Sequence, residues 1–386
     1  MSKHAAVRGQ EDQAHSEAFA AYCEAGSRRA AELGNRGPIR FEADGSLHRD
    51  IVQAYAECGF YIFEKVIGEG ELADLEREAV ELFDQAPVAP GAKVDSQGRP
   101  ALGADGLGGG VAMVRPLSDP LGGTAKNNGR HPSKMYEPKP AEDAPAWVPQ
   151  IVTGSLQFSE AALRLYGHPD LLRVAAAFAG DDFSPFNEVI WYKAPRLGGS
   201  VAWHQDGTTH WDAADFHRDS HGFNFMAQLY GCNAVNGLWV VPGSHVSKAD
   251  IKSWVDAAGS DQLPDAVPLL CGPGDVAITN RQTVHGSFPN TSDAWRITVN
   301  FGFIPRASVL GARGNGIHAT GSEHVIYDAA RIEKRSEVLG YAIAARSQKY
   351  PHEPAYRYQP QAGRVFEWNE VAKAGLRGYN KLDLGV

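Results

Sequence analysis

The 386-residue sequence has little cysteine and no long apolar run. Its four cysteines are scattered, without the close spacing of zinc sites or disulfide frameworks, so we expect reduced thiols and a reducing compartment. No apolar stretch approaches the length that a membrane-spanning helix needs, and residues 1–33 contain no continuous apolar segment typical of a secretory signal. These absences predict a cytoplasmic protein that does not associate with membranes.

The sequence also lacks an excess of positive charge. It has 37 Lys and Arg residues against 46 Asp and Glu residues, which gives a formal net charge of -9. Nucleic acids and anionic membranes are bound through basic surfaces, so this balance argues against both as partners. With 43% hydrophobic residues the chain can bury a large core. We therefore expect a globular protein.

Both ends of the chain look like additions to a central domain. Residues 13–33 are rich in Ala and Glu and are followed by Gly34, Gly37 and Pro38, which predicts a helical N-terminal extension over residues 1–40. Residues 47–85 predict the order helix, strand, helix, with the strand in FYIFEKV. After residue 306 a helical pattern returns in YDAARIEKRSEVLGYAIAARSQ, so residues 311–386 are expected to form a C-terminal extension packed on the same domain.

Residues 85–149 show no periodicity and are rich in Gly and Pro. A loop of this length is usually either a functional lid or disordered, and the sequence leaves both interpretations open. Its GLGGG stretch does not follow a predicted strand and open a helix, so it is no dinucleotide-binding fingerprint. Lys126, Arg130 and Lys134 are candidates for binding an acidic substrate group, with a solvated loop as the simpler alternative.

The region before residue 306 is dominated by short β-rich runs separated by Gly, Pro, Asn and Asp, among them FNEVIWYKAP, NFMAQLYGC and WRITVNFGFIP. Many short strands with turn signals predict a sandwich or a barrel. The expected fold is mainly β with flanking helices, an α+β protein with a double-stranded β-helix core (jelly roll, cupin-like). We expect this central domain to cover residues 41–310.

The run WHQDGTTHW places His204 and Asp206 on either side of one residue. Side chains two apart on a strand point to the same face, so this pair has the spacing to hold one metal ion. An ordinary solvated strand face has the same pattern, and a third ligand is needed. His285 supplies it, because two histidines and one carboxylate form the facial triad of non-haem Fe(II) oxygenases, which leaves coordination positions open.

Arg296 follows His285 after the turn-rich stretch PNTSDA. We expect these two residues on adjacent antiparallel strands, with the guanidinium close to the ion. A co-substrate that chelates iron through a keto acid has a free carboxylate at its other end. A planar, permanently charged Arg binds such a group in bidentate fashion. Arg296 is therefore the candidate anion clamp.

Several motifs together resemble the phytanoyl-CoA dioxygenase family of Fe(II)/2-oxoglutarate oxygenases, which includes ectoine hydroxylases. They are ECGFYIFEKVIGEGELADL, YKAP before WHQD, NGLWVVPGSH, and GDVAITN before HGS. The resemblance runs from about Asp44 to about Pro305. It implies Fe(II) as cofactor, 2-oxoglutarate and O2 as co-substrates, and hydroxylation of an unactivated carbon of a small molecule with release of succinate and carbon dioxide.

The resemblance also assigns residues. It implies that His204, Asp206 and His285 bind iron, and that Arg296 and Ser287 bind the distal carboxylate of 2-oxoglutarate. Asn187 falls where related enzymes place an amide that contacts the same co-substrate, although ectoine hydroxylases have the longer Gln there. Halogenases of this superfamily have a small residue in place of the carboxylate ligand, so Asp206 disfavours halogenation.

Four residues are candidates for the substrate pocket. Trp211 follows the ligand strand closely, Met226 and Gln228 alternate on a predicted strand, and Lys193 has the charge to neutralise an anion; ordinary packing or a surface charge is the alternative for each. Three other functions stay open. They are desaturation, epoxidation or ring formation at the same iron centre in natural-product metabolism, a non-catalytic jelly-roll binding module, and a zinc-dependent hydrolase.

Overall fold

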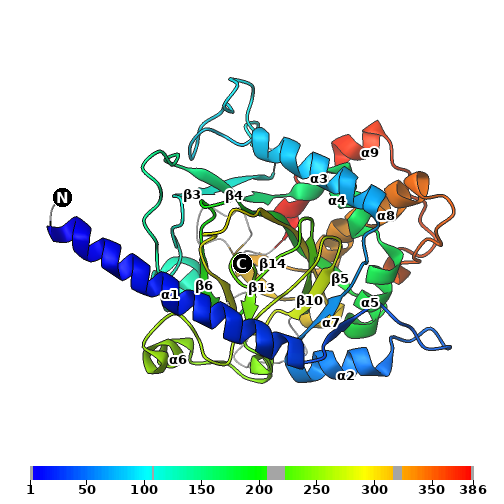
Figure 1. Cartoon of the computed structure of the whole chain (residues 1–386). Coiled ribbons are helices and arrows are strands. Elements are labelled where there is room, and N and C mark those ends of the chain that lie inside the picture. Colours follow the sequence, from blue (N-terminus) through cyan, green and yellow to red (C-terminus); the bar gives the residue numbers. More distant parts are fainter. Residues whose placement is uncertain (1–2, 107, 207–221, 316–323, 384–386) are drawn as a thin grey trace.

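The computed structural model describes residues 3–106, 108–206, 222–315 and 324–383, and its strands form two main sheets (Figure 1). The large sheet has eight strands, in the order β1 (Arg36–Gly37), β2 (Phe60–Phe63), β10 (Val276–Asn280), β7 (Phe223–Gln228), β12 (Arg296–Ile304), β5 (Ser184–Lys193), β4 (Val148–Thr153) and β3 (Gly110–Val114). The small sheet has the order β6 (Val201–His204), β11 (His285–Ser287), β8 (Trp239–Val240) and β9 (Val267–Pro268). The pairings in both sheets are antiparallel except for β1 with β2. The result is the expected α+β fold with a jelly-roll core.

The central strands of the large sheet alternate between an apolar outer face and a polar inner face. On β12 the side chains of Ile297, Val299 and Phe301 join the main hydrophobic core, whereas Arg296 and Thr298 line a cavity on the other face. β7 does the same with Phe223 and Phe225 outward and Asn224 and Met226 inward. Because successive side chains of a strand alternate between its two faces, the residues that stabilise the fold point outward and those that line the cavity point inward.

Helices cover the outer face of the large sheet. The main hydrophobic core joins the outward side chains of the sheet to those of five helices, which are α2 (Arg49–Cys58), α3 (Glu69–Asp84), α4 (Glu160–Tyr166), α5 (Pro169–Ala179) and α8 (Ala329–Lys349). The helix, strand, helix order predicted for residues 47–85 is confirmed by α2, β2 and α3. α8, from the C-terminal part of the chain, packs on α4 and β5, which brings it close behind the cavity-lining face of β5.

The small sheet is covered by the long N-terminal helix α1 (Lys3–Glu32), which extends beyond the sheets at its N-terminal end in Figure 1. Tyr22 of α1 stacks on Trp239 with ring centroids 4.3 Å apart, and its hydroxyl donates a 2.8 Å hydrogen bond to the Leu263 carbonyl. Gly26 passes so close to Trp239 that an added Cβ would lie 2.4 Å from the indole ring. A small residue is therefore required where the helix crosses the sheet.

The segment from residue 85 to 149 differs from the structureless loop that the sequence suggested. Residues 110–114 form β3, which pairs with β4 and extends the large sheet. The apolar side chains of Val111 and Val114 explain this, since Val111 packs against the main core and Val114 is buried. The rest of the segment carries a short 3-10 turn, η1 (Lys126–Gly129), and ends in the first two residues of β4, with no further strand among its described residues.

The remaining elements lie mainly towards the C-terminus. They are α6 (Ile251–Ala258), α7 (Arg306–Val309), the hairpin of β13 (Arg313–Asn315) and β14 (His324–Ile326), α9 (Glu370–Gly375), and the 3-10 turns η2 (Ser155–Gln157), η3 (Ser244–Val246), η4 (Gln359–Gln361) and η5 (Tyr379–Leu382). Within the described parts of the chain, no helix has the length and apolar character required to cross a membrane.

Candidate metal and co-substrate site

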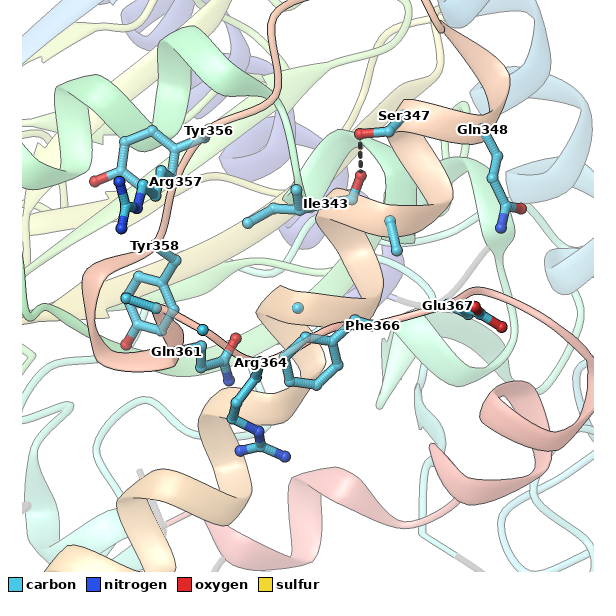
Figure 2. Close-up of a pocket in the computed structure, with 14 residues that line it drawn as sticks. Ile343, Ser347, Gln348, Tyr356, Arg357, Tyr358, Gln361, Arg364, Phe366 and Glu367 are labelled. Carbon is cyan, nitrogen blue, oxygen red and sulfur yellow. Dashed lines mark hydrogen bonds between the residues drawn. The ribbon is translucent and has the colours of Figure 1, made fainter.

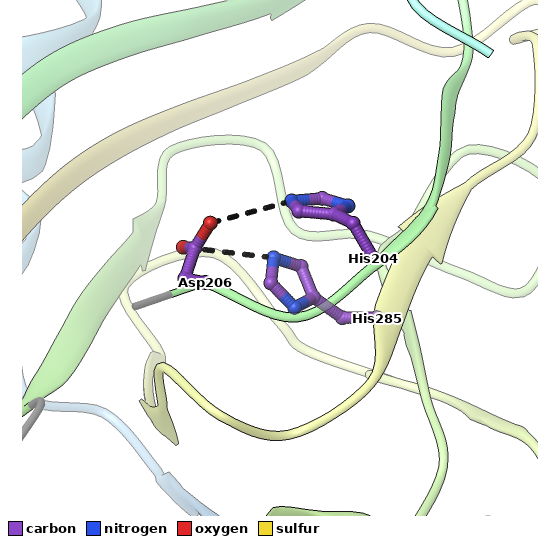
Figure 3. A group of neighbouring side chains, drawn as sticks. All are labelled: His204, Asp206 and His285. Atoms are coloured by element: carbon purple, nitrogen blue, oxygen red, sulfur yellow. Dashed lines mark ion pairs between the residues drawn. The ribbon is translucent and has the colours of Figure 1, made fainter. Parts of the chain in front are cut away.

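The structure brings His204, Asp206 and His285 together between the two sheets (Figure 3). His204 ends β6 and His285 begins β11, and the two residues are direct partners in the antiparallel pairing of these strands. Asp206 follows β6, with its Oδ1 3.5 Å from His204 Nε2 and its Oδ2 4.0 Å from His285 Nε2. One potential ligand atom from each residue lies within 4.8 Å of the other two. This arrangement suits a single ion.

Backbone carbonyls set the tautomer of both histidines. His204 Nδ1 donates to the Ala202 carbonyl and His285 Nδ1 donates to the Thr283 carbonyl, each at 2.8 Å. A carbonyl only accepts, so the proton resides on Nδ1 and the lone pair of Nε2 faces Asp206. Burial lowers the pKa of both rings, that of His204 well below its ordinary value. Both imidazoles are therefore neutral, as metal ligands must be.

Asp206 is an ionised carboxylate inside the protein. Burial alone would raise its pKa, but the positive charges around the carboxylate, that of Arg130 the largest, outweigh this effect and hold the pKa well below its usual range. Arg130 Nη1 lies 3.1 Å from Asp206 Oδ1, and Arg281 Nε lies 4.0 Å from Oδ2. The site thus contains a charged oxygen ligand beside two neutral nitrogen ligands, which is the donor set that the facial triad requires.

Gln205, between the two ligands, points away from the ion and fixes the local backbone. Its Nε2 donates to the carbonyls of Ser244, Ser247 and Gln282, and its Oε1 accepts from the Ala249 amide at 2.9 Å. The end of β6 is therefore tied to the turn after β8 and to the segment before β11. This role of Gln205 was not predicted, although the alternation around His-x-Asp places residue 205 on the opposite face.

Arg296 lies on β12 of the large sheet, not on a strand adjacent to β11. The prediction that His285 and Arg296 occupy adjacent antiparallel strands was therefore wrong, since β12 pairs with β5 and β7. The turn-rich segment between them crosses from one sheet to the other. Asn290 stabilises this crossing, because its Nδ2 donates to the carbonyls of Lys193, Ala194 and Ala294. Arg296 and His285 nevertheless line the same cavity, from opposite sheets.

Two uncharged side chains orient Arg296, Thr298 by direct contact and Gln228 through Thr298. Arg296 Nε donates to Thr298 Oγ1 at 3.0 Å, and Thr298 Oγ1 donates to Gln228 Oε1 at 2.9 Å. Burial lowers the pKa of the guanidinium, though an arginine stays charged. Gln228 does not line the cavity, contrary to its prediction as a pocket residue. It instead orients the arginine through Thr298.

The cavity that contains the triad and Arg296 has a volume of about 240 Å³. Its lining includes the predicted residues Ser287, Asn187 and Met226. It also includes Asn224, Thr298 and Asn300, which the sequence analysis did not single out although they alternate with core residues on β7 and β12. The other described lining residues are Leu121, Asn127, Arg130, His131, Ile151, Thr153, Val189, Trp191, Val201 and Leu238.

Lys193, a further predicted pocket residue, does not line this cavity. Lys193 is buried and its Nζ donates to the Phe288 carbonyl, which directs it away from the ligands. Trp211 lies outside the described residues. Lys193 was predicted from its charge, but its register on β5 places it opposite Arg296 at the strand end, where the Phe288 carbonyl accepts a hydrogen bond from it.

The 85–149 segment contributes one wall of the cavity. Besides Arg130, it brings His131 against the metal site, with its ring centroid 4.3 Å from that of His204. Burial lowers the pKa of His131 to about 4, so this ring is neutral. Of the three basic residues weighed as anion-binding candidates, Arg130 reaches the cavity, whereas Lys126 and Lys134 are exposed. The solvated-loop interpretation was wrong for Arg130.

A second cavity, with a volume of about 580 Å³, lies between α8 and residues 356–367 in the C-terminal part of the chain (Figure 2). Two of its polar side chains are already engaged, since Ser347 Oγ donates to the Ile343 carbonyl and Arg364 pairs with Glu337 and Glu333. It contains none of the triad residues. Size alone therefore does not make it the reactive site, because catalysis needs converging ionisable groups.

Comparison with known families agrees with this geometry. The model of the family described as phytanoyl-CoA dioxygenase matches residues 55–298, which include the triad and Arg296. The chain belongs to the phytanoyl-CoA dioxygenase family. No curated protein sequence matches it significantly.

Among solved structures, this phytanoyl-CoA dioxygenase family member is similar to EctD from S. alaskensis with 2-oxoglutarate and 5-hydroxyectoine, at 20% identity and a TM-score of 0.49, over 70% of this chain and 81% of that one. It is also similar to SnoK, a non-haem α-ketoglutarate-dependent carbocyclase from nogalamycin biosynthesis, at 17% identity and a TM-score of 0.44, over 69% and 87%. AviO1 from Streptomyces viridochromogenes Tue57 matches at 21% identity and a TM-score of 0.45, over 66% and 92%.

Membership of the phytanoyl-CoA dioxygenase family makes the protein an oxygenase that uses Fe(II) and 2-oxoglutarate. The residues fit both groups. Two neutral imidazoles whose Nε2 atoms face an ionised carboxylate satisfy the preference of Fe(II) for the facial triad, and a buried guanidinium in the same cavity fits a dicarboxylate. The prediction of the family, of its fold and of its cofactors is thereby confirmed.

Proposed function

We propose that this oxygenase hydroxylates an unactivated carbon of a small-molecule substrate, with release of succinate and carbon dioxide. The observation that carries the proposal is the convergence of His204, Asp206 and His285 with Arg296 on one cavity. Fe(II) bound to the three ligands supplies oxygen activation coupled to decarboxylation of 2-oxoglutarate. Since Asp206 occupies the carboxylate position, halogenation is not part of the proposal.

In the proposed complex, Arg296 and Ser287 bind the distal carboxylate of 2-oxoglutarate. Arg296 is held by Thr298, so its fork is oriented before the co-substrate arrives, which lowers the entropy that binding has to offset. Ser287 is two residues after His285 on β11, so both face the same cavity. The Asn187 carboxamide contacts the same co-substrate from β5.

The substrate then occupies the part of the cavity with apolar walls. Trp191 and Met226 come from the large sheet, and Leu121 comes from the 85–149 segment. Apolar walls bind the carbon skeleton and exclude water, and the few polar groups orient it. A cavity of about 240 Å³ suits a small molecule. We place this reaction in the cytoplasm and assign it to a domain of residues 41–310, with the two terminal segments packed on it.

The test is co-substrate turnover with a panel of small molecules. We expect succinate to form only when Fe(II) is added, and a substrate from the panel to gain the mass of one oxygen atom. A product that loses two hydrogens instead would replace hydroxylation by desaturation or ring formation at the same centre. Failure to form succinate with Fe(II) across the panel would contradict the proposed activity and favour a binding role.

A further inference from the structure

Asn187 occupies an irregular position in β5. Phe301 of β12 pairs with Glu188, but the next residue, Gly302, pairs with Phe186, so Asn187 is the extra residue of a β-bulge. Its φ of 45° lies in the left-handed region, which asparagine adopts more readily than most residues with a side chain. The bulge turns its side chain into the cavity that holds Arg296 and the triad. A strained conformation of this kind persists only where neighbouring groups maintain it.

The groups that maintain the bulge come from the C-terminal end of the chain. The Asn187 amide donates a hydrogen bond to the carboxylate of Asp383. Arg335 of α8 holds this carboxylate with Nε at 2.7 Å and Nη2 at 3.2 Å, and its Nη2 also donates to Glu188 at 2.5 Å. The Tyr379 hydroxyl donates to the second oxygen of Glu188. The backbone of Asn187 and the side chain of Glu188 are therefore both tied to the C-terminal segment.

This network is buried, and three of its members lie outside the region that matches the family model. Arg335 and Asp383 are each 0% exposed and Glu188 is 2% exposed. The family match ends at residue 298, so Arg335, Tyr379 and Asp383 belong to an addition that the family model does not describe. A buried, charge-assisted network of this kind restricts the geometry of the groups that it contacts. Of the groups that this network contacts, the Asn187 amide lies nearest to the cavity that contains the triad.

We propose that Asp383 is a positioning residue for co-substrate binding. It holds the Asn187 backbone in the left-handed bulge, so that the Asn187 carboxamide is presented to 2-oxoglutarate, and Arg335 in turn holds Asp383. This proposal rests on the proposed function, in which Asn187 contacts 2-oxoglutarate. The C-terminal segment thereby acts on the reaction without any of its own atoms touching the co-substrate.

The experiment measures 2-oxoglutarate binding by anaerobic calorimetry with Fe(II) in full-length variants. The variants are Asp383→Ala, Asn187→Ala and the two combined. Asp383 is one of the groups that raise the pKa of Glu188, so its loss favours ionisation of Glu188 beside Arg335, which compensates the buried guanidinium, and the variant is expected to fold. The matched control is Arg377→Ala, which removes an exposed ion pair of the same segment with Asp105, away from Asn187.

We expect Asp383→Ala and Asn187→Ala each to raise the Kd of 2-oxoglutarate roughly tenfold, and the combined variant to bind no more weakly than Asn187→Ala. Arg377→Ala should bind like the unaltered protein. In the absence of metal and co-substrate, amide hydrogen exchange in residues 184–193 should be faster in Asp383→Ala and unchanged in Arg377→Ala. A purely anchoring role for the network would leave the Kd unchanged.

Three results would overturn the proposal. If Asn187→Ala weakens binding but Asp383→Ala does not, Asp383 has no positioning role and the assignment of Asn187 stands. If the two effects multiply in the combined variant, Asp383 acts by a route other than Asn187. If Asn187→Ala binds 2-oxoglutarate normally, the assignment of Asn187 within the proposed function is wrong, and the positioning role of Asp383 is wrong with it. If Asp383→Ala fails to fold, Asp383→Asn can replace it, because Asn keeps the shape of the side chain. Asp383→Asn should also raise the Kd of 2-oxoglutarate, by a smaller factor.

Discussion

His204 and His285 face each other directly across the paired strands β6 and β11, with ring centroids 4.1 Å apart. Each ring donates from Nδ1 to the backbone carbonyl two residues before it in the chain. The antiparallel register thus fixes both the separation of the rings and the nitrogen that each presents. The two histidines are thus already positioned by the strands, and Asp206 completes the triad. A single residue between His204 and Asp206 is sufficient to place the carboxylate beside both rings.

The first prediction concerns Asp206→Ala. Asp206 provides the only carboxylate of the triad, so its loss should weaken Fe(II) binding by more than about 100-fold, beyond the range typical of residues that merely support a ligand. Succinate formation should disappear with it. Anaerobic Fe(II) titration measures the first effect. Asp293→Ala, which removes an exposed carboxylate paired with Arg196, is the control and should bind Fe(II) normally. Normal Fe(II) affinity in Asp206→Ala would remove Asp206 from the metal site.

The second prediction separates the co-substrate from the metal. Arg296→Leu should raise the KM for 2-oxoglutarate while Fe(II) affinity is largely retained, because the guanidinium lines the cavity but is not a ligand. Loss of a buried charge that pairs with a carboxylate costs about 2 to 5 kcal/mol. Arg196→Leu removes an exposed arginine and serves as the control. An unchanged KM for 2-oxoglutarate in Arg296→Leu would contradict the assignment of the clamp.

The metal ligands could be predicted from the sequence because they depend on local geometry. The His-x-Asp spacing needs only the alternation of a strand, and the alternating pattern around Arg296 and Met226 marks the inner face of the large sheet. The pairing of β12 could not be predicted. The segment 288–295 looks like a hairpin turn, but it crosses between sheets, and the choice is made by long-range hydrogen bonds of Asn290.

The position of Arg130 could not be predicted from the sequence for a different reason. Arg130 lies in a segment without periodicity, so nothing in its neighbourhood distinguishes it from the exposed Lys126 and Lys134. Its position depends on contacts with residues far away in the chain, among them Asp206. The role of Gln228 was misjudged for a related reason. Its place on the inner face of β7 was inferred from alternation, but the side chain is used to orient Arg296 through Thr298.

The third prediction concerns pH and the buried Glu188. Burial raises the pKa of Glu188 to about 7 despite the opposing effect of Arg335, whereas its ordinary value is 4.5. The folded protein therefore retains a proton that the unfolded chain releases, so the contribution of Glu188 to stability is present below pH 4.5 and is lost as the pH rises through about 7. The free energy of unfolding of Glu188→Gln should fall less between pH 5 and pH 8 than that of the unaltered protein.

Urea denaturation at the two pH values tests this. Glu333→Gln, an exposed carboxylate of the same helix as Arg335, is the matched control and should keep the pH dependence of the unaltered protein. The groups facing Glu188 are Arg335, Tyr379 and Asp383, and Glu188→Gln leaves all three in place. Equal changes in unfolding free energy for Glu188→Gln and the unaltered protein would show that Glu188 does not hold the proton.

The last prediction concerns the wall of the cavity formed by residues 119–136 and its attachment to α1. The Tyr136 hydroxyl donates to Asp12 at 2.6 Å, and the His15 ring stacks on Tyr136 with centroids 3.9 Å apart, so the N-terminal helix braces the segment that carries Arg130 and His131. Tyr136→Phe removes one hydrogen bond of about 1 kcal/mol but keeps the stacking, so amide hydrogen exchange in residues 119–136 should become roughly fivefold faster.

A looser cavity wall in Tyr136→Phe should also admit water and increase the succinate formed without substrate oxidation. Lys134→Ala removes the exposed ion pair with Glu137 but leaves the hydrogen bond between Glu137 and the Asp119 amide in place, so it is the control and should alter neither value. Unchanged exchange in Tyr136→Phe would show that α1 does not brace this wall.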